Sequence, residues 1–363
     1  MGEDEFTARS VDLQIGGQHG PVAQGDAALL RGLQRSSGMA IAWCPARGEV
    51  LALDAAGTGM RPVDLSKGKV SPKTTGALAA LRSAGADFGF VLDMQDRRAK
   101  RIAPEGEPVP PVFAFNRLTG DGQRILLPLP VYHDFGTGHF ADAVRPDAVA
   151  WEEKVPRVVW RGITGGRAAL DAEGLVEGMR VKMAMRRHRE GRMSEAELRA
   201  VLAACPRWGL LERLKDDPRF DMGFVDGDGY VIARTPLHAH LERPRMPQVA
   251  MQGYRYIAVL RGLDVGSSFY WVMHSGSLGM VMETPFETFA SGHFRPWEAY
   301  LPFALDGSDL RARLDWAEAN PGAVREMVAK AGAIAALLIR ADLREAILRR
   351  VVARVAALPR VTL

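Results

Sequence analysis

The sequence predicts an α/β protein of two domains, and three features support that class. The 363 residues exceed the roughly 150 that are typical of one domain, so we expect two domains, each long enough for a hydrophobic core. Short apolar runs of strand length alternate with segments of helical periodicity along much of the chain. Residues 254–303 show this alternation most clearly, because they read as strand, glycine-rich turn, helix and strand, which is a βαβ unit.

The composition excludes several other classes of protein. Hydrophobic residues make up 47% of the chain and charged residues 25%, which leaves no room for a disordered or fibrous protein. The formal net charge of +4 suits anionic ligands but falls short of a nucleic-acid-binding domain, so we expect no nucleic-acid partner. Cys44 and Cys205 stand far apart and predict neither a disulfide framework nor a metal site.

The chain shows no signal peptide or membrane span. Its first residues are acidic and then polar, without a basic region followed by an apolar one. The longest clean apolar run, residues 331–339, is far shorter than the roughly 18 residues that a membrane span needs. We therefore expect a soluble, cytoplasmic protein, with peripheral contact with the inner membrane as an additional possibility.

Residues 1–150 are expected to form the first lobe. Its strands are predicted over residues 40–44, 49–54, 87–92, 112–115 and 125–131, and its helices over 27–33 and 73–84. Asp96 closely follows the strand at 87–92. In an open α/β sheet, ligands gather beyond the carboxyl ends of the strands, so Asp96 is a candidate for the functional site.

Residues 151–320 are expected to form the second lobe, which contains two glycine-rich turns. One turn, 161–166, follows a strand at 155–160, and the other, 261–268, follows a strand at 256–260. Exposed backbone N–H groups in such turns, and the helix N-terminus after the second, suit the phosphates of a nucleotide. The alternative is an ordinary βαβ unit that binds nothing, since a fold does not fix a function.

Three other segments of this lobe were considered. Residues 170–215 are predicted to be mostly helical and are basic between 180 and 192. Residues 226–229 are interpreted as a turn, because the further oxygen ligands of a calcium loop are missing. His238 and His240 have no Cys, Asp or Glu cluster beside them, so no zinc site is expected.

Residues 321–363 form a C-terminal segment that is predicted to be helical to about Leu358. Its apolar residues lie on one stripe with arginines around it. Such a helix either packs against protein or lies on a membrane surface. Packing, which we favour, predicts that Ile347, Val351 and Val355 are buried.

The chemistry of the site is narrowed by motifs that are missing. The sequence contains no Gly-x-Ser-x-Gly elbow, no phosphate-binding loop ending in Gly-Lys-Ser/Thr and no Gly-x-Gly-x-x-Gly after a strand. Glycosyl transfer from a nucleotide sugar fits what is left. An inverting enzyme needs a carboxylate to accept the proton of the acceptor hydroxyl, and cations or backbone dipoles to hold the departing diphosphate.

Asp96 is the candidate for the carboxylate, and Arg161, Arg261 and the turn Gly266-Ser267-Ser268 are candidates for holding the diphosphate. Each has a plainer interpretation. Asp96 is equally typical of a solvated loop carboxylate. Arg161 is equally typical of a structural ion-pair partner.

Three stretches of the chain resemble glycosyltransferase family 90. They are VVWRGITGG at 158–166, the tract at 254–303 and DGSDLRARLDW at 306–316, with a weaker similarity over 87–131. The family includes protein O-glucosyltransferases, fungal capsule xylosyltransferases and bacterial lipopolysaccharide-type transferases. Its bacterial branch carries a tract like KYI…GNDV…KWVM, then FETWF and HYV, which the tract at 254–303 matches closely.

The resemblance implies a GT-B fold, in which two Rossmann-like lobes face a cleft and a C-terminal helix returns to the N-terminal lobe. It also implies an inverting, metal-independent hexosyl- or pentosyltransferase without a cofactor. The co-substrate would be a UDP-sugar such as UDP-glucose or UDP-xylose. The acceptor would be a glycan or glycolipid hydroxyl of a bacterial lipopolysaccharide or surface polysaccharide.

The resemblance also implies roles for individual residues. Asp96 falls on the aspartate that acts as the catalytic base, and Glu287 falls where a carboxylate holds the donor ribose. The donor-binding residues implied are Arg161, Gly162, Arg261, Gly262, Asp264, Gly266, Ser267, Ser268 and Glu287.

The chain departs from the family pattern at Leu263, Tyr270, Phe289 and Ala299, where the bacterial branch has Asn, Lys, Trp and His. The substitutions at Leu263, Tyr270 and Ala299, of which Tyr270 removes a cation, motivate a second hypothesis. In that hypothesis the chain keeps the transferase fold but has lost turnover, and acts as a scaffold that binds a nucleotide sugar or a glycan.

Overall fold

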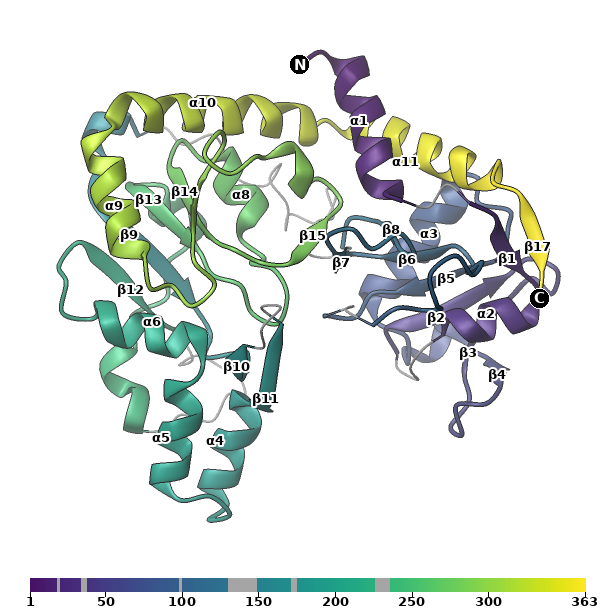
Figure 1. The fold of residues 1–363 in the computed structure, drawn as a ribbon, viewed down its shortest axis with the longest axis horizontal. Helices are drawn as coiled ribbons and strands as arrows, with labels where there is room; N and C mark the ends of the chain where they lie inside the picture. The colour runs from purple at the N-terminus through teal and green to yellow at the C-terminus, as the bar shows by residue number, and fades with distance from the viewer. Residues whose placement is uncertain (18–19, 34–37, 98–99, 130–148, 171–174, 226–235) are drawn as a thin grey trace. The chain divides into compact units, whose positions relative to one another are not determined.

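The chain divides into two compact units, which are described separately (Figure 1). A computed structural model describes the chain except for residues 18–19, 34–37, 98–99, 130–148, 171–174 and 226–235. Unit 1 comprises Met1–Ala143, Phe286–His293 and Leu337–Leu363, and unit 2 comprises Val144–Pro285 and Phe294–Ala336. Both units are mixed α/β with parallel strand pairs, so the predicted class is confirmed. Domain boundaries at 150 and 320, and lobes facing each other as in GT-B, stay predictions.

Unit 1 is built around a six-stranded sheet. Its strands, in the spatial order β4-β3-β2-β5-β6-β8, are Met60–Pro62, Glu49–Leu53, Ala40–Cys44, Phe90–Asp93, Val112–Ala114 and Ile125–Leu126. Neighbours from β4 to β5 are antiparallel, and β5, β6 and β8 are parallel. The sequence predicted all of these strands except β4. The run expected over 125–131 contains only the short β8 among its described residues.

The remaining elements of unit 1 are helices and two small strand pairs. The helices are α1 (Glu3–Ile15), α2 (Asp26–Gly32), α3 (Pro72–Ser83) and α11 (Ala341–Ala356), with short 3₁₀ turns η1 (Leu65–Lys67) and η5 (Ser291–His293). Strand β1 (Val22–Gln24) pairs in parallel with β17 (Arg360–Thr362), and β7 (Asn116–Leu118) pairs antiparallel with β15 (Phe286–Thr288).

Helix α3 shows how local sequence sets an element of this unit. The Ser71 side chain accepts a hydrogen bond from the Lys73 N–H at 3.4 Å, and Pro72 occupies the first turn, where no backbone donor is needed. Gly85, at φ +90°, follows the helix in the left-handed conformation that commonly ends helices. The residues buried between these ends are spaced three and four apart: Thr74, Ala77, Leu78 and Leu81.

The C-terminal segment confirms one expectation and corrects another. Ile347, Val351 and Val355 are buried as predicted, on the face of α11 that packs against α1. The single long helix expected from Pro321 is instead two helices, α10 (Pro321–Leu338) and α11. Arg340 interrupts the helix with an extended backbone at ψ 116°. The side chain of Arg344 donates to the Leu338 carbonyl at 3.2 Å, which caps the end of α10.

Unit 2 contains a five-stranded sheet in which every neighbouring pair is parallel. Its strands, in the spatial order β12-β9-β13-β14-β16, are Phe220–Phe224, Val155–Gly162, Tyr254–Val259, Leu278–Met282 and Leu301–Phe303. Of these strands the sequence predicted β9, β13 and β14. An all-parallel sheet covered by helices is compatible with a Rossmann-like fold.

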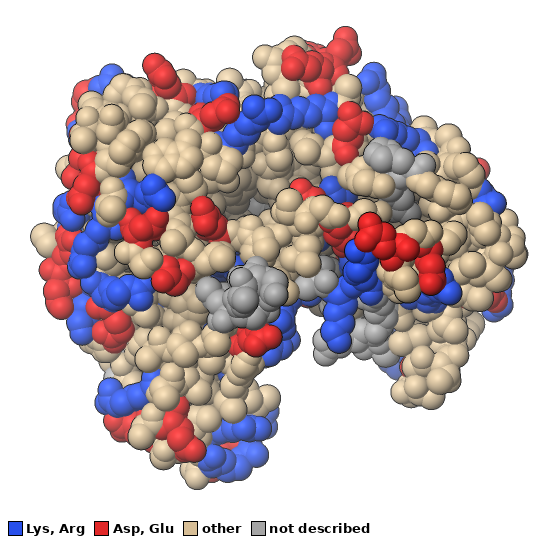
Figure 2. All heavy atoms as spheres, viewed as in Figure 1, with Lys and Arg blue, Asp and Glu red and all other residues tan. Residues whose placement is uncertain are grey.

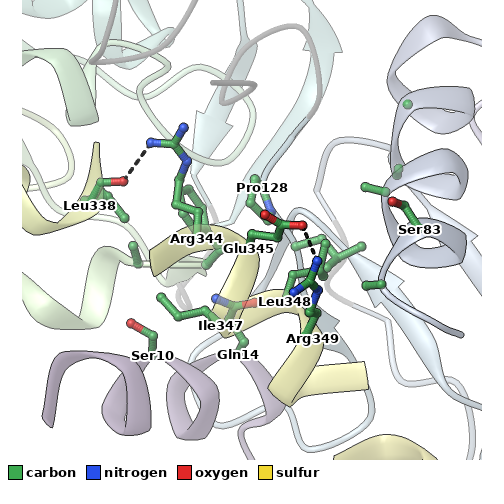
Figure 3. Close-up of a pocket in the computed structure, with 17 residues that line it drawn as sticks. Ser10, Gln14, Ser83, Pro128, Leu338, Arg344, Glu345, Ile347, Leu348 and Arg349 are labelled. Carbon is green, nitrogen blue, oxygen red and sulfur yellow. Dashed lines mark hydrogen bonds and ion pairs between the residues drawn. The ribbon is translucent and has the colours of Figure 1, made fainter. Parts of the chain in front are cut away.

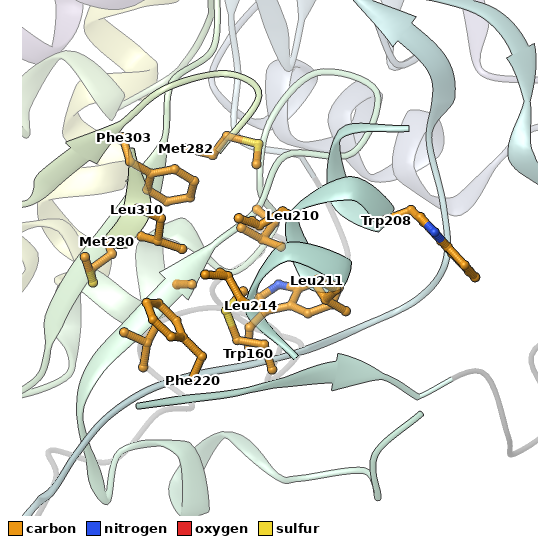
Figure 4. Close-up of a cluster of buried hydrophobic side chains, with 14 of the residues drawn as sticks. Trp160, Trp208, Leu210, Leu211, Leu214, Phe220, Met280, Met282, Phe303 and Leu310 are labelled. Carbon is orange, nitrogen blue, oxygen red and sulfur yellow. The ribbon is translucent and has the colours of Figure 1, made fainter. Parts of the chain in front are cut away.

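The helices of unit 2 bury a large core against this sheet, part of which is drawn in Figure 4. They are α4 (Val181–Arg189), α5 (Glu195–Ala203), α6 (Pro206–Leu214), α7 (Gln248–Met251), α8 (Phe269–His274), α9 (Leu310–Ala319) and α10, with 3₁₀ turns η3 (Trp151–Glu153) and η4 (Pro236–Leu241). Trp160 of β9 and Trp208 of α6 both pack on Phe224 of β12, with ring centroids 5.9 and 6.0 Å away.

The prediction that residues 170–215 are mostly helical needs one correction. Before α4, strands β10 (Arg167–Leu170) and β11 (Val176–Arg180) pair as an antiparallel hairpin. Strands this short offer too few residues for a periodic pattern to reveal them. The predicted turn at 226–229 lies outside the described residues.

Figure 2 shows Lys and Arg interspersed with Asp and Glu on the face it draws.

Candidate functional site

The two glycine-rich turns predicted from the sequence lie together in unit 2. They follow β9 and β13, which are parallel neighbours, so both turns stand at the carboxyl edge of the sheet. A Cβ atom added to Gly166 would lie 3.8 Å from the Gly262 carbonyl oxygen and 3.9 Å from the Cys205 sulfur. Gly166 also has φ +106°, a conformation that residues with a side chain rarely adopt. The two turns therefore lie side by side, and the backbone conformation at position 166 favours glycine.

A small recess of about 10 Å³ opens between these turns and the start of α6. Its volume is that of a single water-sized group. The lining combines glycine backbone with cationic side chains: Gly165, Gly166, Arg167, Cys205, Pro206, Arg207, Arg261 and Gly262. Backbone N–H groups beside guanidinium groups are the partners that an anionic oxygen prefers.

Arg207 holds this edge together, and the sequence analysis missed it. Its guanidinium donates to the carbonyls of Arg261 at 2.9 Å, Ile163 at 3.1 Å and Leu260 at 2.9 Å. It thereby joins the ends of β9 and β13. The group also lies over the Trp160 ring, 5.5 Å from the centroid. The sequence contained one signal for Arg207. A cation in the first turn of a helix is unfavourable for the helix dipole, so an arginine at that position indicates a role outside the helix.

Arg161, a predicted donor-binding residue, is engaged inside unit 2. Its guanidinium donates to the Pro244 carbonyl at 3.1 Å and the Asp221 carbonyl at 2.6 Å, and it pairs with the Asp221 carboxylate at 2.7 Å. Burial would raise the pKa of Asp221, but hydrogen bonds from Tyr254 and Arg161 bring that pKa below its ordinary value. Arg161 thus links β9 to β12, which is the structural interpretation that the sequence left open.

The turn after β13 is compact and contains two buried charged residues. Arg261 and Asp264 are 3% and 6% exposed. The Asp264 carboxylate accepts the Val265 N–H at 2.7 Å, and the Asp264 carbonyl accepts the Thr284 hydroxyl at 2.6 Å. A Cβ atom on Gly266 would lie 2.5 Å from a Val259 methyl group, so no larger residue fits there. Ser267 and Ser268 complete the turn just before α8.

Glu287 lies in unit 1, on β15, directly opposite Arg117 of β7. The two form an ion pair at 2.7 Å, in which Arg117 is 2% exposed and Glu287 is 23% exposed. Arg117 also donates to the carbonyls of Leu13 at 2.5 Å and Gln14 at 2.9 Å, the last turn of α1. A cation there complements the helix dipole, and Glu287 balances its charge. The ribose-binding role of Glu287 stays a prediction.

Asp96 lies three residues beyond the end of β5, in unit 1, and is exposed. The nearer carboxylate, Asp93, is instead 4% exposed and accepts hydrogen bonds from Gln95 at 3.0 and 3.3 Å. Of the two, only Asp96 is open to an incoming ligand. The predicted place of Asp96, beyond the carboxyl end of a strand, agrees with the structure.

The positions that depart from the family pattern are packed inside the chain. Tyr270 is 3% exposed, with its ring 5.3 Å from Phe269 and 6.3 Å from Phe294. Ala299 is 2% exposed, and Leu263 is half-buried. A cation at position 270 would therefore occupy an aromatic interior rather than open solvent.

The described residues show neither a cluster of metal ligands nor a membrane-spanning helix. Within the described residues, no group of three or more His, Cys, Asp or Glu side chains could hold a metal ion. Cys44 and Cys205 are free and buried, and burial raises the pKa of the Cys205 thiol. No helix in the described part of the chain is both long and apolar enough to cross a membrane.

One family model matches the part of the chain that contains the turn after β13. A family model described as glycosyl transferase family 90 matches residues 237–344. No curated protein matches the chain. The matched stretch contains β13, the turn with Arg261 and Gly262, α8 and β14. The match supports a glycosyltransferase, an enzyme class that binds a nucleotide sugar and an acceptor.

Proposed function

We propose that the chain is an inverting, metal-independent glycosyltransferase of bacterial type and GT-B fold. It transfers glucose or xylose from the UDP-sugar to a hydroxyl of a lipopolysaccharide or surface polysaccharide in the cytoplasm. The observation that carries this proposal is the meeting of two glycine-rich turns at the carboxyl edge of the unit 2 sheet, one of them inside the family match. Ligands of open α/β folds bind at such an edge.

One phosphate oxygen of the donor diphosphate is assigned to the recess in unit 2, which has room for one water-sized group, and the rest of the diphosphate lies outside it. Backbone N–H groups of the turns and the cations of Arg207 and Arg261 stabilise the negative charge that develops as UDP leaves. Gly262, Gly266 and the two serines after it leave the backbone accessible. In this proposal Arg161 and Glu287 support donor binding indirectly. The ion pair of Arg161 with Asp221 holds β9 in place, and the ion pair of Glu287 with Arg117 holds β15 in place.

The catalytic base is assigned to Asp96. In the inverting reaction the acceptor hydroxyl oxygen attacks the anomeric carbon on the face opposite UDP. The carbon–oxygen bond to UDP breaks, and its electron pair leaves with the diphosphate. The hydroxyl proton passes to the Asp96 carboxylate, whose exposed position beyond β5 suits an incoming acceptor.

Calorimetric titration with UDP, UDP-glucose and UDP-xylose tests the donor assignment. The full chain is expected to bind at least one of the sugars. Arg207→Lys should weaken that binding about tenfold, because an ammonium group cannot bridge three carbonyls as a guanidinium does. Arg213→Lys, an exposed arginine on the same helix, is the matched control and should bind like the wild type. Absence of binding to all three ligands would overturn the proposal.

A scaffold that binds a nucleotide sugar or glycan without turnover is the second candidate. It is favoured by the departures at Leu263, Tyr270 and Ala299 and by the ion pairs that engage Arg161 and Glu287. Titration and turnover separate the two candidates. Tight binding of a UDP-sugar without release of UDP would favour the scaffold.

A further inference from the structure

Unit 1 contains a larger pocket that the proposed donor site does not use (Figure 3). Its volume is about 290 Å³, near the lower limit of roughly 300 Å³ for small-molecule sites. It is bounded by α1, α3 and α11, by Leu127 and Pro128 after β8, and by Phe289 and Ala290 after β15. All of these segments belong to unit 1.

Most of the pocket wall is apolar. Helix α3 contributes the small side chains of Ala77 and Ala80, and α11 contributes Ile347 and Leu348 opposite them. Because the alanines of α3 have only a methyl group, they leave open the space between α3 and α11 that larger side chains would fill. The apolar part of a ligand would therefore be removed from water in this pocket. This burial favours binding in proportion to the apolar area that is buried.

Gln14 adds a specific polar group to this wall. Its side chain lines the pocket and is 3% exposed, yet its Oε1 has no hydrogen-bond partner among the described residues. Buried polar atoms are nearly always paired, so this oxygen lacks the donor that such atoms normally have. Ser10, one turn earlier on α1, is already bonded to His293 at 2.8 Å. Gln14 is thus poised to bond a ligand.

Charged groups of both signs stand on α11 at the same pocket. Arg349 donates to Glu345 at 2.5 Å, and their side chains are 64% and 62% exposed. Arg344 is the third charged residue of the lining. Donors and an acceptor side by side suit a neutral head group rich in hydroxyls better than a strongly charged one.

We propose that this pocket binds a neutral amphiphile, with an alkyl chain in the apolar part, a hydrogen bond to Gln14 and a hydroxylated head near Arg349 and Glu345. The pocket and Asp96 share one edge of the unit 1 sheet. Leu127 follows β8 and Asp96 follows β5, at the carboxyl ends of the parallel strands β5, β6 and β8. That this amphiphile is the lipid-bearing acceptor rests on the proposed function, whereas the binding itself does not.

Titration of the full chain with hexyl β-glucoside and methyl β-glucoside tests the pocket. The hexyl compound should bind and the methyl compound should not, because only the former carries an alkyl chain. Ala80→Leu fills the pocket from an exposed position on α3 and should weaken hexyl glucoside binding about tenfold or more. Ala79→Leu, the exposed neighbour that does not line the pocket, should bind like the wild type.

Gln14→Leu tests the hydrogen bond. Removing this partner should weaken hexyl glucoside binding roughly two- to tenfold, the net effect of one hydrogen bond. Thermal unfolding of each variant without ligand confirms that it is folded. Equal binding by wild type and Ala80→Leu, or no binding of the hexyl compound, would overturn the proposal. Hexyl glucoside binding without UDP-sugar binding would instead leave the pocket standing and overturn only the proposed function.

Discussion

Two arginines illustrate, at the scale of single residues, how the chain fixes its turns. Arg207 joins the ends of β9 and β13, and Arg117 joins the last turn of α1 to β15. Each uses the planar, multiply donating guanidinium to satisfy several backbone carbonyls. Arg117 is 170 residues from its partner Glu287, and Arg161 is 60 residues from Asp221. Sequence patterns identify such arginines as candidates, but they cannot tell which partner, ligand or carboxylate, lies opposite.

His293 gives a prediction about pH. Burial, and then the charge of Arg9, lower its pKa from 6.5 to about 4, and its ring stacks on Phe6. Between these two values the unfolded chain binds a proton that the folded chain does not. The free energy of unfolding should therefore fall as pH drops from 6.5 to 4, by roughly 3 kcal/mol from this residue. Denaturant unfolding at a series of pH values measures the loss.

The control for this prediction is a pair of variants. His293→Gln should flatten the pH dependence of the unfolding free energy between pH 6.5 and 4. His188→Gln removes a histidine whose Nδ1 lies 3.0 Å from the Met193 carbonyl oxygen rather than beside a carboxylate, and should leave the slope unchanged. A slope in His293→Gln as steep as that of the wild type would show that another group is responsible.

At the scale of elements, the glycine-rich turns were predictable and their meeting was not. Each turn follows an apolar run of strand length, which a sequence pattern reveals. The strands β9 and β13 are neighbours because of the order of strands in the sheet. No local sequence pattern predicts that order. The three-residue strands β15 and β16 and the hairpin β10–β11 were missed for a related reason, because they are too short to show a period.

Gly166→Ala tests the importance of these turns. An alanine at φ +106° adopts a backbone conformation that costs roughly 1–2 kcal/mol for residues with a Cβ atom. The variant should unfold at a lower temperature and bind UDP-sugar more weakly. Gly191→Ala is the matched control, because Gly191 also has a positive φ, +69°, but does not line the recess; this variant should lose stability and still bind UDP-sugar like the wild type. Equal UDP-sugar binding by the Gly166→Ala and Gly191→Ala variants would contradict this role for Gly166.

At the scale of the whole molecule, the α/β class and most strands of the two larger sheets could be predicted, because these strands are buried apolar runs. The break between α10 and α11 could not, since Arg340 sits in a segment that looks helical throughout. It falls shortly after the chain passes from unit 2 to unit 1, between Ala336 and Leu337. The burial of Ile347, Val351 and Val355 was predictable from their spacing and leaves the apolar stripe of α11 occupied by protein.

Release of UDP from UDP-glucose and UDP-xylose, compared between wild type and Asp96→Asn, tests the central claim most directly. The variant keeps the shape of the side chain but removes the base, so UDP release should slow by about 10²–10⁴ while UDP-sugar affinity is unchanged. Asp4→Asn, an exposed aspartate on α1, is the control and should react like the wild type. UDP release by Asp96→Asn at the wild-type rate would contradict the account.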